Sequence, residues 1–245
     1  MWLTLGESVA GTSHRFRNTP CQDAFRFARY GPADESLVIA VADGAGSAAH
    51  GEAGARRACD EFIREFQSVA NAGWNREKIV DVFSRVRAAL CQEAENLAVP
   101  PRQLACTALL ALIEPTQAAF AQIGDGCTVI GDSEGYRVAF WPELLEYANA
   151  THFLTDDDWP ASLQFESVLA CINEVAVLTD GLQRLALDFQ TRKPFTGFFG
   201  PLFQTLRGAA DSELIAEQLR VFLDSERVNV RTDDDKTLVL AVRRS

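Results

Sequence analysis

Three apolar runs in this chain each end in Asp-Gly, and this pattern restricts the fold and the function more than any other feature. The pairs are Asp43-Gly44 after LVIAVA, Asp125-Gly126 after AAFAQIG and Asp180-Gly181 after VAVLT. Near-continuous apolar runs predict strands that are buried on both faces. A carboxylate at a strand end, beside a glycine that allows close approach, is a suitable ligand for a hard cation such as Mg²⁺ or Mn²⁺.

A fourth acidic group, Asp233-Asp234-Asp235, comes just before the apolar run TLVLAV. Each group also has a simpler interpretation. Asp43 and Asp180 are good helix N-caps, Asp125-Gly126 is a typical hairpin turn, and the triplet suits a solvated acidic turn. Recurrence favours a shared cation site, because independent turns do not require aspartate at every strand end.

The order of the predicted elements indicates an α+β protein. Hairpin-linked strands are interrupted by two blocks of helices, which differs from the regular alternation of a parallel α/β sheet. We therefore expect an antiparallel β-sandwich with helices on both outer faces, forming a single domain over 1–245. The expected strands are 2–10, 24–30, 36–43, 104–113, 118–124, 127–132, 136–141, 172–179 and 237–243. The expected helices lie within 44–67 and at about 75–98, 181–190, 195–207 and 211–224.

Composition excludes several classes of protein. Hydrophobic residues make up 47% of the 245 residues, which is typical of a globular chain. The net charge of −11 argues against binding to nucleic acid or to an anionic membrane. The longest apolar stretch is about half of what spans a bilayer, and the first residues lack a secretory signal pattern. We expect a cytoplasmic protein whose six cysteines are reduced.

Five short motifs, in order, resemble the metal-dependent Ser/Thr protein phosphatases of type 2C in their bacterial form. They are SHRFRNTPCQDA, VADGAGS, ACTALLAL with QIGDG, LTDGL, and DDKTLVLAV, and together they cover about residues 6–243. Each motif is only moderately specific, but five in the family order make a specific match. The family fold is a β-sandwich flanked by helices, in agreement with the architecture expected above.

The resemblance implies a set of metal ligands. Asp43 matches the aspartate that bridges two catalytic ions, and Gly44 matches the residue that offers a carbonyl oxygen. Asp180 and Asp234 match the remaining ligands of the two core ions, Mg²⁺ or Mn²⁺. Asp125 matches the aspartate that holds a weaker third ion in bacterial members.

Other positions either support the site or depart from the family pattern. Asp23 matches the aspartate that supports the network of metals and water. The family arginine that binds the substrate phosphate is replaced by Asn18, so Arg15 and Arg17 are the candidates for that role. Eukaryotic members have a histidine where this chain has Ala45, and a water is then expected to protonate the leaving group.

The implied activity is hydrolysis of phosphoserine and phosphothreonine in a phosphorylated protein, in opposition to a bacterial Ser/Thr kinase. Two alternatives remain open at this point: hydrolysis of small phosphate esters, and a catalytically weak regulatory relative that binds a phosphorylated partner. The loss of arginine at position 18 favours the second alternative, whereas the complete set of aspartates argues against it. A variable flap-like segment is expected at about 131–171, beside the active site.

Overall fold

Two five-stranded antiparallel sheets form the centre of the protein. The computed structural model describes residues 1–31, 33–67, 73–132, 135–142, 151–209 and 212–244. The first sheet has the order β1-β12-β9-β6-β7 and the second has the order β2-β3-β4-β5-β8. The first contains β1 (Trp2–Val9), β12 (Lys236–Arg243), β9 (Glu174–Leu178), β6 (Cys127–Asp132) and β7 (Gly135–Val138). The second contains β2 (Asp23–Tyr30), β3 (Ser36–Asp43), β4 (Ala108–Ile113), β5 (Ala118–Ile123) and β8 (Gln164–Val168).

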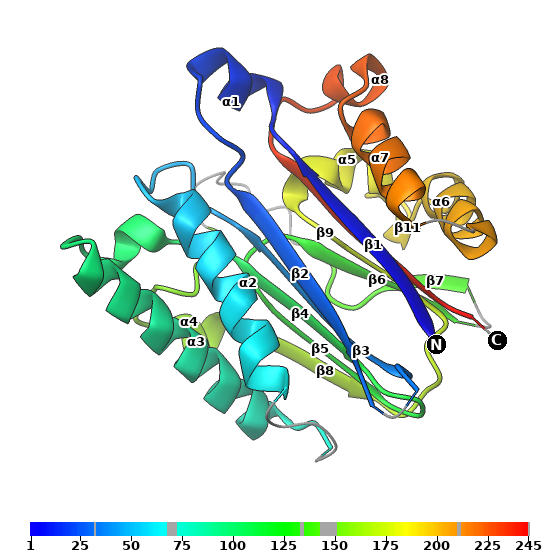
Figure 1. Ribbon diagram of the computed structural model, residues 1–245, viewed down its shortest axis with the longest axis horizontal. Helices are drawn as coiled ribbons and strands as arrows, with labels where there is room; N and C mark the ends of the chain where they lie inside the picture. Colours follow the sequence, from blue (N-terminus) through cyan, green and yellow to red (C-terminus); the bar gives the residue numbers. More distant parts are fainter. Residues whose placement is uncertain (32, 68–72, 133–134, 143–150, 210–211, 245) are drawn as a thin grey trace.

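Helices cover the outer face of each sheet (Figure 1). Helices α2 (Gly51–Gln67) and α3 (Arg76–Asn96) pack on the second sheet, and α6 (Thr196–Gly208) and α7 (Ser212–Leu223) pack on the first. The expected α+β sandwich with helices on both outer faces is therefore confirmed. Among the described residues, no helix is both long and apolar enough to cross a membrane.

Strand β3 shows why its sequence is continuously apolar. Leu37, Ile39 and Val41 lie in the core between the two sheets. Val38 and Ala40 point to the opposite face and belong to the core beneath α2 and α3. Because alternate side chains enter two different cores, none of these positions tolerates a polar residue.

The two ends of the chain lie in one sheet. β1 pairs antiparallel with β12 along its whole length, from Trp2 opposite Arg243 to Val9 opposite Lys236, and Figure 1 shows the termini side by side. β12 also pairs with β9. The start of β12 and the end of β9 therefore lie at the same end of the sandwich.

Several elements differ from the sequence-based expectation. The polar segment after β1 contains helix α1 (Thr12–Arg17). Strand β4 begins only at Ala108, after the 3-10 helix η1 (Pro101–Leu104) and an isolated β-bridge between Cys106 and Gly44. The expected helix at 181–190 is replaced by shorter pieces. These are η2 (Asp180–Leu182), α5 (Gln183–Ala186) and β10 (Leu187–Asp188), which pairs with β11 (Lys193–Pro194). The remaining short helices are α4 (Trp159–Ser162) and α8 (Glu226–Asn229).

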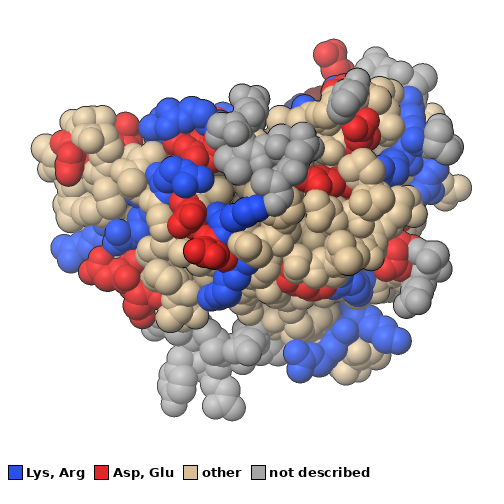
Figure 2. Space-filling view, turned by 90° about the horizontal axis from the view of Figure 1, so that it is seen from below, with Lys and Arg blue, Asp and Glu red and all other residues tan. Residues whose placement is uncertain are grey.

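The expected flap segment, 131–171, contains the end of β6 together with β7, α4 and β8. Its residues 133–134 and 143–150 lie outside the described part of the chain. Acidic and basic side chains are interspersed over the face of the molecule shown in Figure 2. Surface ion pairs such as Arg137 with Glu166, at 2.6 Å, add little stability because water screens them.

Candidate metal centre

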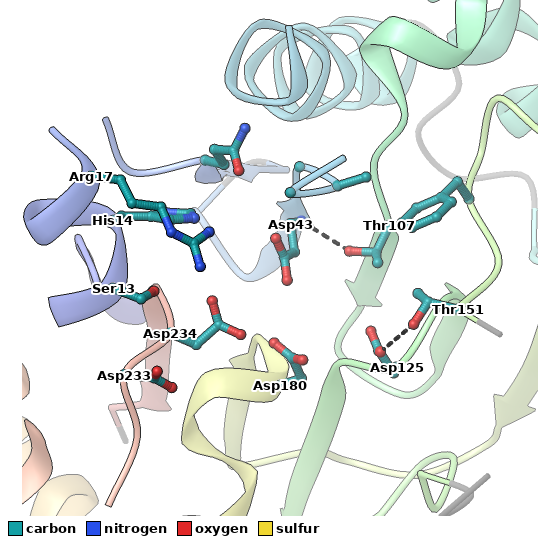
Figure 3. A pocket seen from close by; sticks show the side chains of 15 residues that line it. Ser13, His14, Arg17, Asp43, Thr107, Asp125, Thr151, Asp180, Asp233 and Asp234 are labelled. Atoms are coloured by element: carbon teal, nitrogen blue, oxygen red, sulfur yellow. Dashed lines mark hydrogen bonds between the residues drawn. The ribbon is translucent and has the colours of Figure 1, made fainter. Parts of the chain in front are cut away.

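Aspartates from four distant segments meet in one cavity. Asp43 ends β3, Asp125 lies in the turn between β5 and β6, and Asp180 follows β9 at the start of η2. Asp234 comes just before β12. All four line a cavity of about 330 Å³, together with Gly44, and Figure 3 shows their carboxylates around a common space. The pairing of β12 with β9 explains why residues 180 and 234 meet there.

The glycines beside the aspartates allow backbone segments to come into contact. A Cβ atom on Gly181 would lie 2.0 Å from the carbonyl oxygen of Asp235, and one on Gly44 would lie 2.4 Å from the backbone of Gly51. Any side chain at either position would separate the segments that carry the aspartates. The Asp-Gly pairs are therefore requirements of packing at the cavity as well as turn signals.

Electrostatics show that the cavity holds excess negative charge. Burial, followed by repulsion from Asp23, Asp180 and Asp234, raises the pKa of Asp43 well above its ordinary value. Burial, followed by Asp125 and Asp234, raises the pKa of Asp180 to about 7. In the described part of the chain, Oδ1 of Asp180 is buried without a hydrogen-bond partner. The carboxylates thus lack the positive charge that their arrangement requires.

This donor set fits divalent cations that retain some of their water. No three His, Cys, Asp or Glu side chains among the described residues are grouped tightly enough to enclose an ion by themselves. The carboxylates line the walls of an open cavity instead, and Mg²⁺ in particular is usually bound by one or two carboxylates and several waters. Oxygen donors without sulfur or imidazole suit Mg²⁺ or Mn²⁺. The residues present therefore fit the expected ions.

Asp23 lies behind the cavity and does not line it. It is the cross-strand neighbour of Asp43 in the β2–β3 pair. Its side chain is buried, and its Oδ2 accepts a hydrogen bond of 2.7 Å from the Thr179 hydroxyl. Burial is the main reason why its pKa rises to about 8. This position suits support of Asp43 better than direct coordination of an ion.

Asp125 and Asp43 are each fixed by a threonine (Figure 3). The hydroxyl of Thr151 donates a hydrogen bond of 2.8 Å to Oδ2 of Asp125. The hydroxyl of Thr107 accepts one of 2.9 Å from the backbone N–H of Asp43. Both threonines line the cavity, and neither was expected from the sequence.

Helix α1 brings positive charge to the edge of the cavity. Arg17 lines the cavity, whereas Arg15 points away and forms a 2.5 Å ion pair with Asp224. Of the two expected phosphate-binding candidates, the structure brings only Arg17 to the aspartates. Asn18 ends the helix in the left-handed conformation, at φ 56°, which asparagine tolerates better than arginine. The departure at position 18 therefore has a local structural reason.

Two further groups, Asp235 and His14, were not expected from the sequence to contribute to the site. Asp235 accepts hydrogen bonds from the backbone N–H groups of Gly11, at 2.7 Å, and Gln22, at 2.6 Å. It also contacts Nδ1 of His14 at 2.8 Å. These contacts attach the segment around α1 to the start of β12. The spacing of His14 and Arg17 would have indicated a shared helix face, but only if the segment had been recognised as helical.

Comparisons with known proteins show the family to which this chain belongs. Residues 10–224 match the family model described as Protein phosphatase 2C. Serine/threonine-protein phosphatase 3 of Escherichia coli K12 is 37% identical over 248 residues, with 98% of each chain covered. The fold matches Stp1 of Staphylococcus aureus with a TM-score of 0.68 at 15% identity, covering 100% of this chain and 96% of that one. It also matches RsbX solved with magnesium, with a TM-score of 0.59 at 16% identity and 98% and 94% coverage. The chain therefore belongs to the protein phosphatase 2C family.

Proposed function

We propose that this protein hydrolyses phosphoserine and phosphothreonine in protein substrates with the help of Mg²⁺ or Mn²⁺. The observation that carries the proposal is the cavity in which Asp43, Asp125, Asp180 and Asp234 converge. The name of the Escherichia coli relative supports the choice of a Ser/Thr phosphoprotein as substrate. We further propose that the protein acts in the cytoplasm and opposes a Ser/Thr kinase there.

Two core ions would be held by Asp43, Asp180 and Asp234 with the Gly44 carbonyl oxygen, and a weaker third ion by Asp125. When bound, such ions lower the pKa of water and stabilise negative charge on a phosphoryl group. Asp43 is in a suitable place to be shared between the ions, because Asp180 and Asp234 both contribute to its raised pKa. Asp23 lies opposite Asp43 in the β2–β3 pairing, and its proposed role is to support Asp43 from behind the cavity.

Arg17 is the proposed phosphate ligand. Its side chain extends from α1 toward the cavity, opposite the aspartates (Figure 3). A guanidinium group there donates hydrogen bonds to the non-bridging oxygens and offsets their charge as the phosphoryl group is transferred. Because Arg17 supplies this charge, the absence of arginine at position 18 is not a reason to interpret the protein as a catalytically weak regulatory relative.

The cysteines nearest to the site are unsuited to covalent catalysis. Cys106 is buried, and burial, followed by the nearby Asp43, raises the pKa of its thiol to about 12. A thiol must lose its proton to act as a nucleophile. Direct attack by water on phosphorus is therefore the reaction that the cavity supports.

The test is phosphate release from a phosphothreonine peptide in the presence of Mn²⁺, compared with release from a nucleotide. We expect the peptide to be preferred, EDTA to abolish turnover, and the Asp43→Ala variant to be inactive. Normal Mn²⁺-dependent turnover by Asp43→Ala would refute the site. A clear preference for the nucleotide would favour the small-ester alternative.

A further inference from the structure

His14 reaches the cavity with its orientation fixed. Its side chain is only 13% exposed, and its Nδ1 lies 2.8 Å from Oδ2 of Asp235. Asp235 is itself 2% exposed and is held by the N–H groups of Gly11 and Gln22. An ionised carboxylate only accepts hydrogen bonds, so Nδ1 carries a proton toward Asp235. The other ring nitrogen, Nε2, is then available on the cavity side.

His14 and Arg17 lie one turn apart on α1 and point in the same direction. Figure 3 shows both side chains extending from the helix toward Asp43 and Asp234. Both also line a side recess of about 330 Å³ next to the catalytic cavity, between α1 and the start of α2. A phosphoryl group bound by Arg17 would therefore lie beside the imidazole of His14.

Hydrolysis of a serine or threonine phosphate requires a proton for a strongly basic alkoxide. Among the described residues that line the catalytic cavity, His14 is the one with an imidazole, the side chain that most often serves as a general acid or base in enzymes. Arg17 retains its proton in proteins. Thr151 donates its hydroxyl proton to Asp125, and Ala45 has no proton to give.

We propose that His14 is the general acid that protonates the leaving oxygen. This inference rests on the proposed function. The oxygen of water forms a bond to phosphorus and becomes a hydroxyl of inorganic phosphate, and the other proton of the water passes to solvent. The bond between phosphorus and the ester oxygen breaks, and its electron pair stays on the ester oxygen. Nε2 of the His14 imidazolium donates its proton to the oxygen, which leaves as the serine or threonine hydroxyl. His14 is left as a neutral imidazole that keeps its Nδ1 proton and donates it in the hydrogen bond to Asp235, and solvent restores the proton at Nε2. Asp235 acts through His14 and is a positioning residue.

The test compares two phosphate monoesters whose leaving groups differ strongly in their need for a proton. A phosphoserine peptide releases a basic alkoxide, whereas 2,4-dinitrophenyl phosphate releases a stable phenolate. We expect His14→Gln to lower kcat on the peptide by about 100-fold or more, and kcat on the dinitrophenyl ester by less than about tenfold. His152→Gln is the matched control, because His152 is exposed and does not line the cavity.

A second variant separates catalysis from structural support. In His14→Asn, the side-chain amide nitrogen takes the place of Nδ1 and retains the hydrogen bond to Asp235, but nothing replaces Nε2. We expect the same selective loss on the peptide with an unchanged Tm. If His14→Asn restored turnover of the peptide, or if both variants slowed the two esters equally, His14 would only attach α1 to β12 and the assignment would be wrong.

A measurement on the metal-free protein adds a readout independent of turnover. With ¹⁵N-labelled histidine, we expect a slowly exchanging Nδ1 proton that is absent from His14→Asn. A His14 ring without that proton would overturn the assignment. If wild type hydrolysed neither ester with Mn²⁺, the proposed function would fail together with this inference. If wild type hydrolysed both and the variants lost them equally, only the role of His14 would fail.

Discussion

Replacing Asp180 with asparagine is expected to stabilise the metal-free protein while it abolishes the response to cations. Burial, followed by the charges of Asp125 and Asp234, holds the pKa of Asp180 at about 7, against an ordinary value of 3.8. The folded state therefore binds the proton more tightly than the unfolded state. The contribution of this proton to the free energy of unfolding is fully present below about pH 4 and is lost as the pH rises through about 7.

The magnitude follows from the two pKa values. At 1.36 kcal/mol per pKa unit, the difference between 3.8 and about 7 corresponds to about 4 kcal/mol of lost stability at pH 8. Entry of water into the cavity and protonation of neighbouring carboxylates reduce this value, so we expect a gain of about 2 kcal/mol for Asp180→Asn. For a chain of this size, that gain raises Tm by about 4–8 °C. At pH 5 the gain is less than half as large, because Asp180 is then protonated in the folded wild type.

The assay is thermal unfolding in EDTA at pH 8 and pH 5, repeated with excess Mn²⁺. Ions that bind only the folded state raise the Tm of wild type by mass action, and we expect no such rise for Asp180→Asn. Asp157→Asn is the control, because Asp157 is fully exposed. Its replacement should change neither the Tm in EDTA nor the rise in Tm with Mn²⁺. A lower Tm for Asp180→Asn in EDTA at pH 8, or a rise with Mn²⁺ equal to that of wild type, would refute the reasoning.

Three further predictions concern residues in the cavity wall and directly behind it. Arg17→Ala should weaken inhibition by inorganic phosphate about tenfold or more, measured by steady-state kinetics. Arg15→Ala should change this inhibition little, because Arg15 pairs with Asp224. Equal effects of the two substitutions would contradict the placement of α1. Gly181→Ala should cost about 2 kcal/mol and weaken Mn²⁺ binding, because its Cβ would meet Asp235 O at 2.0 Å. Thermal unfolding measures the cost, and Gly200→Ala, which has open space at its Cβ, should be tolerated in the same assay. Asp235→Ala should lower the free energy of unfolding in urea by about 3 kcal/mol, because it leaves the N–H groups of Gly11 and Gln22 without their acceptor. A decrease below about 1 kcal/mol would contradict the role of Asp235 in attaching this segment.

The sequence was sufficient to predict the sandwich because both faces of its central strands are buried. β3 and β4 are apolar at nearly every position, and such runs are recognisable without any knowledge of their partners. The convergence of Asp43, Asp180 and Asp234 was also predictable, because each comes at the end or the beginning of such a strand. The roles of these residues as metal ligands stay predictions.

The contribution of α1 was not predictable in the same way. Its six residues have no apolar periodicity, and no residue of the helix is buried. The helix is held instead by polar contacts with Asp235, more than 200 positions away in the sequence. Local patterns carry no information about such a partner. For this reason the sequence did not separate Arg15 from Arg17, and it gave no reason to consider His14.

Diffraction from crystals grown with Mn²⁺, recorded for anomalous scattering, tests the metal centre most directly. We expect two strong peaks about 3.5–4 Å apart, lying between the carboxylates of Asp43, Asp180 and Asp234. Both peaks should disappear in crystals of Asp43→Ala. An absence of ions from this cavity at saturating Mn²⁺, in a protein that still releases phosphate from phosphothreonine peptides, would contradict the account.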